Sequence, residues 1–141
     1  MAAVATLLSI AALIVVLLRT STTNASPVTT PPTFTAGETS AAHQKLCDSY
    51  RLVARAVQIE TNGTSPERAG IAEVNGAMTL KDAVDAYPAI TSGDRAAAVA
   101  LARAYNNLAA VASLNDSSLW QSALDDTNAK DAAMKKVCGG S

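Results

Sequence analysis

The chain has 141 residues, which favours one domain, and its 11 basic and 12 acidic side chains give a formal net charge of −1. This balance excludes the basic surface of a nucleic-acid-binding protein and a basic membrane-binding patch. Hydrophobic residues make up 49% of the chain, but an apolar N-terminus inflates that fraction. The remainder is rich in alanine and poor in aromatic residues, so its core buries little area and we expect modest stability.

The first element is an apolar run over 4–18, with the sequence VATLLSIAALIVVLL. This run is short for a transmembrane helix and has the length of a signal-peptide core. Thr23–Ala25 forms an acceptable small-residue cleavage site before Ser26, so residues 1–25 are interpreted as a signal peptide. An uncleaved anchor is the alternative, because no Lys or Arg precedes the run and Arg19 follows it.

Proline and threonine dominate residues 26–38, and no periodic apolar face exists there, so we predict a linker. A helical domain is expected over 39–141. Its first helix is predicted from Thr39 to about Glu60, with Thr39 or Ser40 as the cap. One face of this helix is apolar at helical spacing, formed by Leu46, Tyr50, Val53 and Val57.

Two brief helices are predicted next. Ser65–Glu67 has the cap, first-position proline and first-turn acid of a helix start, and Gly70 and Gly76 are expected to interrupt the helix that begins there. Thr79–Tyr87 is predicted to be a separate helix, capped by its first residue. Pro88 ends it, because proline lacks the N–H and its ring obstructs the preceding turn.

Two longer helices complete the domain, from Asp94 to Leu114 and from about Ser118 to Val137. The first has an apolar face of Val99, Leu101, Ala102, Tyr105, Leu108, Ala109 and Ala112. On the second, the residues expected to face the core are Leu119, Ala123 and Leu124, and those expected to face water are Asp125, Asp126, Lys130 and Asp131. Lys135 and Lys136 suit the helix dipole at its last turn. No strand-type alternation of useful length occurs, so the predicted fold is all-α, an antiparallel bundle or hairpin of alanine-rich helices.

Two N-glycosylation sequons lie in predicted inter-helix loops, at Asn62-Gly63-Thr64 and at Asn115-Asp116-Ser117. A third match, at Asn24, straddles the proposed cleavage site. Exposed loops are where the glycosylating enzyme could reach an asparagine. The sequons therefore agree with export, and unmodified loop asparagines are the alternative.

Cys47 and Cys138 are the two cysteines of the chain. In an exported protein a pair of cysteines favours a disulfide. An internal bridge would tie the last helix to the first and stabilise the fold by about 4–5 kcal/mol. The alternatives are pairing with a partner chain or with a segment that this chain lacks.

Signs of catalysis or metal binding are few. His43 precedes Cys47 by one helical turn, but a nucleophilic cysteine needs an orienting group beside its base, and export favours oxidation of the thiol. We interpret His43 as a partly exposed helix residue, and we expect no catalytic residue, cofactor or metal. Tyr50, Tyr105 and Trp120 are interpreted as core or loop anchors, with an aromatic binding patch as the alternative.

Two segments resemble a known family when taken together and in order. Leu46–Ala54, LCDSYRLVA, resembles the opening helix of the B-type N-terminal domain of trypanosome variant surface glycoproteins. Leu114–Trp120, LNDSSLW, resembles a segment found downstream of that helix in the same family. The predicted signal peptide precedes these two segments, as it does in that family. Between the two segments the chain carries no family signal.

The resemblance implies a surface-coat glycoprotein. Members of that family form elongated helical homodimers on a glycolipid anchor at the external side of the plasma membrane, and they shield the cell from host antibodies by antigenic variation. They have no catalytic residues. Cys47 would be a disulfide partner at a helix end, and Asn115 would be the sequon within the second motif.

The chain departs from that family at its C-terminus. Family members are several times longer and end in a cysteine-rich domain and a hydrophobic anchor signal, whereas this chain ends at Ser141 without a hydrophobic tail. The resemblance therefore indicates a truncated copy, secreted or at the cell surface. A small secreted helical module that binds another protein is the alternative function.

Overall fold

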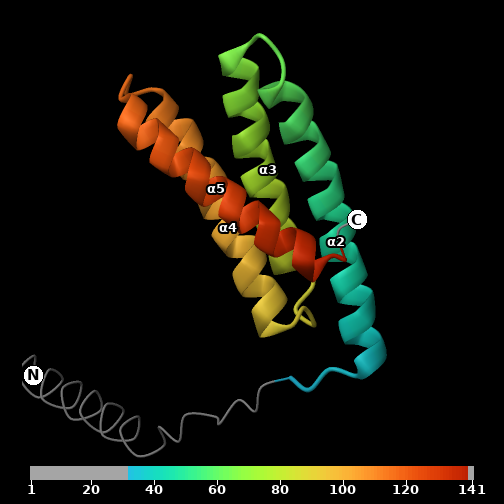
Figure 1. Ribbon diagram of the computed structural model, residues 1–141. Helices are drawn as coiled ribbons and strands as arrows, with labels where there is room; N and C mark the ends of the chain where they lie inside the picture. Colours follow the sequence, from blue (N-terminus) through green and yellow to red (C-terminus); the bar gives the residue numbers. More distant parts are fainter. Residues whose placement is uncertain (1–31, 140–141) are drawn as a thin grey trace, which may run out of the picture. The chain divides into compact units, whose positions relative to one another are not determined.

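The computed structural model describes residues 32–139, and the predicted signal peptide lies outside the described residues. Figure 1 shows the four helices of this part, which are α2 (Ala36–Thr61), α3 (Pro66–Ala86), α4 (Ser92–Ala112) and α5 (Ser117–Val137). Residues 32–139 contain no strand, so the all-α prediction is confirmed. None of these four helices is apolar enough over a sufficient length to cross a membrane.

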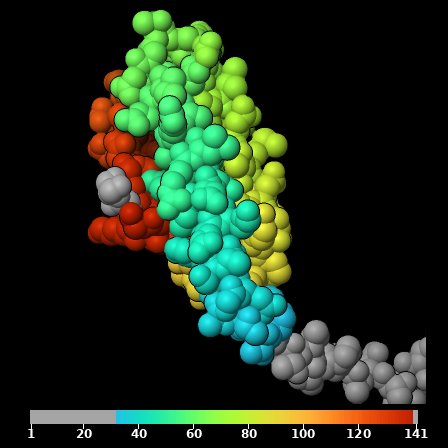
Figure 2. All heavy atoms as spheres, turned by 90° about the vertical axis from the view of Figure 1, so that its right-hand side faces the viewer, coloured from blue at the N-terminus to red at the C-terminus, as the bar shows by residue number. Residues whose placement is uncertain are grey.

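The helices run alternately up and down, and each packs against its neighbour in the chain. α3 packs against both α2 and α4, and α5 packs against α4, while α2 and α5 contact each other at few positions. The result is two antiparallel hairpins, α2–α3 and α4–α5, whose turns lie at the same end of the helical unit (Figure 1). The antiparallel bundle is confirmed, and it is open on the side where α2 faces α5. From the α2 side, the space-filling view places α2 between α3 and α5 (Figure 2).

α2 begins earlier than predicted, inside the expected linker. Thr35 is its N-cap, and the Thr35 hydroxyl accepts a hydrogen bond from the Glu38 N–H. The Glu38 carboxylate in turn accepts from the Thr35 N–H at 2.8 Å, which completes a capping box. The prediction of Thr39 or Ser40 as the cap was therefore wrong, because the Thr-x-x-Glu pattern was overlooked.

α3 is one continuous helix, which corrects the prediction of two brief ones. Gly76 lies within this helix and does not interrupt it. The glycine is buried, and its missing side chain lets α2 approach α3 closely. A Cβ atom at Gly76 would lie 2.7 Å from Val53 Cγ1. The propensity cost of a mid-helix glycine, about 1 kcal/mol, is offset by this close packing. Thr79 is not a cap: its hydroxyl donates to the Asn75 carbonyl at 2.9 Å within the helix. The end of the helix before Pro88 is confirmed.

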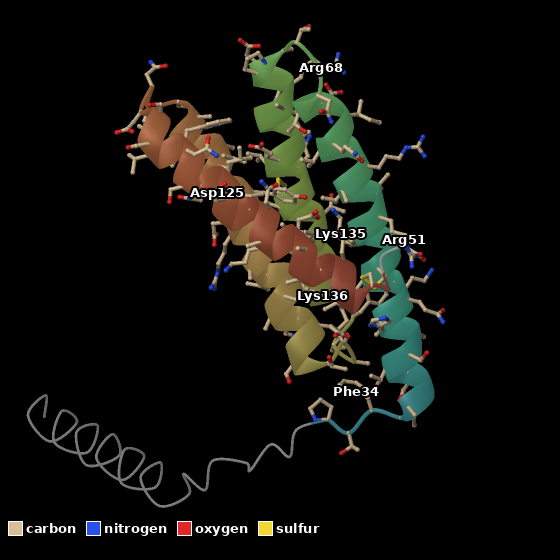
Figure 3. All side chains as sticks on the ribbon, viewed as in Figure 1. Phe34, Arg51, Arg68, Asp125, Lys135 and Lys136 are labelled. Carbon is tan, nitrogen blue, oxygen red and sulfur yellow. A yellow bond between two sulfur atoms is a disulfide. The ribbon has the colours of Figure 1, made fainter. Side chains whose placement is uncertain are left out.

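The starts of α4 and α5 are also fixed by side-chain caps. Thr91 caps α4 by accepting from the Asp94 N–H, so the helix begins two residues before the predicted start. Asp116 caps α5 by accepting from the Ser118 and Leu119 N–H groups. Many charged side chains, such as Arg51 and Asp125, project from the outer surface (Figure 3).

The core is concentrated at the end of the bundle opposite the α2–α3 and α4–α5 turns. Each helix contributes one fully buried large side chain, and these are Leu46, Leu80, Leu101 and Met134. On the predicted face of α2, Leu46, Tyr50 and Val53 are buried and Val57 is partly buried. We call this region the closed end of the bundle.

The disulfide lies at the closed end. Cys47 of α2 and Cys138, the C-cap of α5, are joined by an S–S bond of 2.06 Å across a sequence separation of 91. The structure thus has the internal pairing. In the chain-entropy account, a loop of this size stabilises the fold by about 4–5 kcal/mol. The bond holds the end of α5 against α2, where these two helices otherwise have few contacts.

Candidate functional site: a cleft between two hairpins

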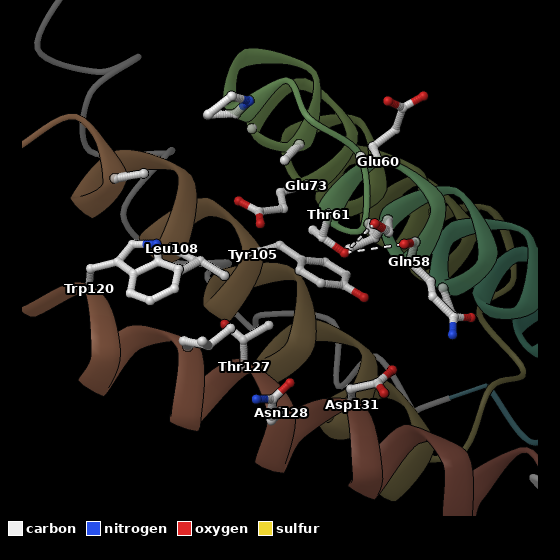
Figure 4. A pocket seen from close by; sticks show the side chains of 18 of the residues that line it. Gln58, Glu60, Thr61, Glu73, Tyr105, Leu108, Trp120, Thr127, Asn128 and Asp131 are labelled. Atoms are coloured by element: carbon white, nitrogen blue, oxygen red, sulfur yellow. Dashed lines mark hydrogen bonds between the residues drawn. The ribbon is translucent and has the colours of Figure 1, made fainter. Parts of the chain in front are cut away.

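A cleft separates the α2–α3 hairpin from the α4–α5 hairpin at the end opposite the closed end. Its volume is about 620 Å³, and all four helices line it (Figure 4). This volume is within the range of small-molecule sites in proteins, roughly 300–1,000 Å³. We call this region the open end of the bundle.

Apolar side chains form most of the cleft walls. α2 contributes Val57, α4 contributes Leu108 and Ala112, and α5 contributes Leu124. Trp120, in the first turns of α5, lines the same cleft with 41% of its surface exposed. Of the two anchor roles expected for Trp120, core or loop, this exposure excludes the core, and it places one aromatic ring where a ligand could reach it.

Glu73 of α3 is the buried carboxylate of the cleft. Only 5% of the residue is exposed, and its side chain projects towards the space between the hairpins (Figure 4). It has no hydrogen-bond or ion-pair partner among residues 32–139. Burial disfavours the charged form and raises the pKa of this carboxyl to about 7.

A second carboxylate, Asp131 of α5, lines the cleft in a different environment. Its Oδ1 accepts a hydrogen bond of 2.7 Å from the Tyr50 hydroxyl, and its Oδ2 lies 2.8 Å from Lys135 Nζ. The expectation that Asp131 faces water was therefore wrong, because it holds α5 against α2. Burial first, and then the hydrogen bond to Asp131, raise the pKa of Tyr50 above its ordinary value.

Tyr105 of α4 lies between these two carboxylates in the cleft (Figure 4). The residue is buried, as the apolar face of α4 predicted. Its pKa is raised, first by burial and then by the negative charges of Asp131 and Glu73. The Tyr105 hydroxyl is thus kept protonated and can donate a hydrogen bond.

Glu60 also lines the cleft but is neutralised by a neighbour. The guanidinium of Arg68 donates two hydrogen bonds to the Glu60 carboxylate, one of them from Nε to Oε2 at 2.7 Å. This pair links the last turn of α2 to the first turn of α3. The hydrogen bond from Arg68 lowers the pKa of the Glu60 carboxyl.

Both sequon asparagines lie in exposed turns, as predicted, and the topology puts both turns at the open end. Asn62 is the C-cap of α2, and its side-chain Nδ2 donates to the Gln58 carbonyl at 2.7 Å. Asn115 lies in the α4–α5 turn with a φ of 53°, in the left-handed region that asparagine tolerates. Glycans at these positions would flank the mouth of the cleft.

At the closed end, His43 lies beside the disulfide. The His43 N–H at Nδ1 donates to Asp94 Oδ2 at 2.9 Å, and Nε2 lies 3.7 Å from Cys47 Sγ. Asp94 is thus the orienting group that the sequence did not reveal. The Cys47 sulfur is bonded to Cys138, so no thiolate faces the imidazole in this structure. The interpretation of His43 as partly exposed is confirmed.

Sequence reasoning missed Glu73, although one signal was available. Glu73 precedes Ala77 by four residues and Leu80 by seven, so it occupies the buried face of α3 at helical spacing. A carboxylate at a core position is the kind of mismatch that marks functional sites. Within residues 32–139, no group of three or more His, Cys, Asp or Glu side chains could hold a metal ion.

No protein-family model, no curated protein and no solved structure matches the chain. The case for a function therefore rests on the residues of the chain and on the geometry of the bundle and its cleft.

Proposed function

We propose that the chain is an exported surface-coat glycoprotein, displayed outside the plasma membrane as a barrier and antigen in immune evasion. The observation that carries this proposal is the position of Asn62 and Asn115 in exposed turns at one end of a bundle whose other end is closed by the Cys47–Cys138 bond. A disulfide and two accessible sequons belong to an oxidising, exported environment.

The resemblance to trypanosome variant surface glycoproteins supports the same function. Leu46–Ala54 includes Cys47 of the disulfide and the buried residues Leu46, Tyr50 and Val53 of α2, and Leu114–Trp120 spans the α4–α5 turn with its sequon and the start of α5. A coat needs a stable scaffold and an exposed, variable tip rather than a reactive site. The two segments fall in these two regions of the bundle.

A second copy of the chain is the partner we propose for the outer face of the α2–α3 hairpin. A shallow groove there is lined by apolar and small side chains that include Ala56 and Ile71. Leu52 and Ile71 both line this groove and are 67% and 60% exposed, so the groove carries more than one exposed large apolar side chain, and contiguous patches of that kind mark protein–protein interfaces. Sedimentation of the wild type beside Leu52→Glu would test this homodimer, with Leu114→Glu as the control, because Leu114 is 62% exposed and does not line this groove. Dissociation by both variants or by neither would contradict it.

Antibody binding to intact source cells tests the coat function. An antibody against the folded bundle should label the cells before they are permeabilised, and removal of N-glycans should shift the mobility of the labelled protein. Labelling that requires permeabilisation would contradict surface display.

The cleft favours a second candidate, a secreted module that binds a partner. In that case the protein would be recovered from the medium as a monomer rather than from the cell surface. Fractionation of the culture into medium and washed cells separates these two functions, because the coat protein stays with the cells.

A further inference from the structure

We propose that the cleft at the open end binds a small organic cation, an amine with an apolar body, whose ammonium group pairs with the Glu73 carboxylate. This inference goes beyond the coat function and does not depend on it. It rests on the burial of Glu73, on the charges around it and on the walls of the cleft.

Glu73 supplies a carboxylate without a protein partner at the right place. The residue is 5% exposed and lines the cleft, its oxygens are not enclosed by the protein, and burial of the residue disfavours its charged form. A ligand ammonium within hydrogen-bond distance would satisfy this group. Charge-assisted hydrogen bonds of this type are stronger than neutral ones, so the carboxylate would favour a cation over a neutral ligand.

The other charged groups of the cleft are already engaged within the protein. Glu60 is held by Arg68, and Asp131 is held by the Tyr50 hydroxyl and by Lys135. Among the described residues that line the cleft, Glu73 is therefore the carboxylate left without a partner. The same arrangement disfavours an anionic ligand, because no cation of the cleft is left uncommitted.

The walls of the cleft define the rest of the ligand. Val57, Leu108 and Leu124 offer aliphatic contact, and Trp120 offers an accessible aromatic face. Cations are also attracted to such aromatic faces. A ligand with one ammonium group and a compact hydrocarbon or aromatic body would thus match both the charge and the apolar walls.

The ionisation of Glu73 makes binding depend on pH. The other titratable groups that line the cleft are Glu60 from α2, Tyr105 from α4, and Asp131 and Lys135 from α5, and of these Tyr105 interacts with the charge of Glu73. Since burial raises the pKa of Glu73 to about 7, roughly one tenth of the free protein is ionised there at pH 6 and about nine tenths at pH 8. An amine that stays protonated should therefore bind up to about tenfold more tightly at pH 8 than at pH 6.

Fluorescence of Trp120, the single tryptophan of the chain, reports binding in the cleft. The mature, disulfide-bonded protein is titrated with 4-phenylbutylamine and with 4-phenylbutanol, which replaces the ammonium by a hydroxyl. We expect the amine to bind at least about tenfold more tightly than the alcohol at pH 8, because only the amine forms an ion pair with Glu73.

Glu73→Gln keeps the shape of the side chain and removes the charge, so it should abolish both the preference for the amine and the pH dependence. Glu67→Gln on the same helix is the control and should change neither, because Glu67 is exposed and does not line the cleft. Equal affinities for amine and alcohol, or no saturable response at millimolar amine, would overturn the proposal. An amine preference that persists in Glu73→Gln would overturn it as well. The affinity of the wild type for the amine, measured from pH 6 to pH 8, tests the proposal without any variant, because an affinity that does not rise with pH would overturn it.

Discussion

The closed end and the open end of this bundle are built from the same four helices but differ in what holds the helices together. At the closed end, Leu46 and Met134 are fully buried and the Cys47–Cys138 bond joins α2 to α5. At the open end, Leu119 is 49% exposed and the cleft separates the hairpins. The comparison indicates that stability is concentrated at one end, which leaves the other free to carry glycans and to bind ligands.

The largest expected effect comes from removing the disulfide at the closed end. Cys47→Ser combined with Cys138→Ser should lower the free energy of unfolding by about 4–5 kcal/mol, because the unfolded chain regains the entropy of an open loop. That is close to the whole net stability of many small domains, about 5–15 kcal/mol. Urea unfolding measures it. Treatment of the wild type with a reductant should match the double variant, and a smaller loss than about 1 kcal/mol would show that the bond does not hold the fold together.

A matched pair of leucines separates the two ends directly. Leu101→Ala at the closed end should cost about 2–5 kcal/mol, because it leaves a cavity in a fully buried site. Leu119→Ala at the open end should change stability by less than about 0.5 kcal/mol. Thermal unfolding of the two variants checks this. Similar losses for both would contradict the division of the bundle into two unlike ends.

Glu73 should make the open end sensitive to pH. Its pKa rises from 4.5 in the unfolded chain to about 7 in the folded protein, so the folded state binds more protons between these values. Stability is therefore greatest below pH 4.5 as far as this group is concerned, and it falls by up to about 3 kcal/mol as the pH rises to 7. Glu73→Gln should remove this fall. Urea midpoints from pH 5 to pH 8 measure it, and an unchanged slope in the variant would assign the pH dependence to other groups.

The smallest expected effects on stability come from alanine substitutions at two glycines of α3. Gly76→Ala should destabilise by about 1–3 kcal/mol, since its Cβ would lie 2.7 Å from Val53 Cγ1. Gly70→Ala meets nothing within 4 Å of its Cβ, so higher helix propensity should stabilise the fold by about 0.5–1 kcal/mol. Effects of the same sign in chemical unfolding would mean that the close approach of α2 and α3 at Gly76 is not needed.

The sequence predicted the closed end better than the open end. Helical periodicity identified Leu46, Tyr50 and Val53 as buried, and export favoured the Cys47–Cys138 pair that the structure has. Periodicity worked there because the buried residues of all four helices pack into one core cluster. Leu119 has the same spacing signal, but it lies at the open end and is 49% exposed.

Contacts between different helices could not be predicted from local sequence patterns. Arg95 of α4 donates to the Val84 carbonyl at 2.9 Å and so caps the end of α3, which no local pattern indicates. The sequence predicts an interruption at Gly76, because the role of this glycine depends on Val53 of another helix. The capping box at Thr35 and Glu38 is different, since both residues are local and their pattern could have been recognised.

The intact mass of the protein purified from its source cells tests whether the bundle is exported, glycosylated and disulfide-bonded. It is measured with and without reduction and with and without removal of N-glycans. We expect a chain that starts at Ser26, carries glycan at Asn62 or Asn115, and gains the mass of two hydrogen atoms when the Cys47–Cys138 bond is reduced. An unprocessed, unglycosylated chain with two free thiols would contradict export, and with it both the closed end and the glycosylated open end.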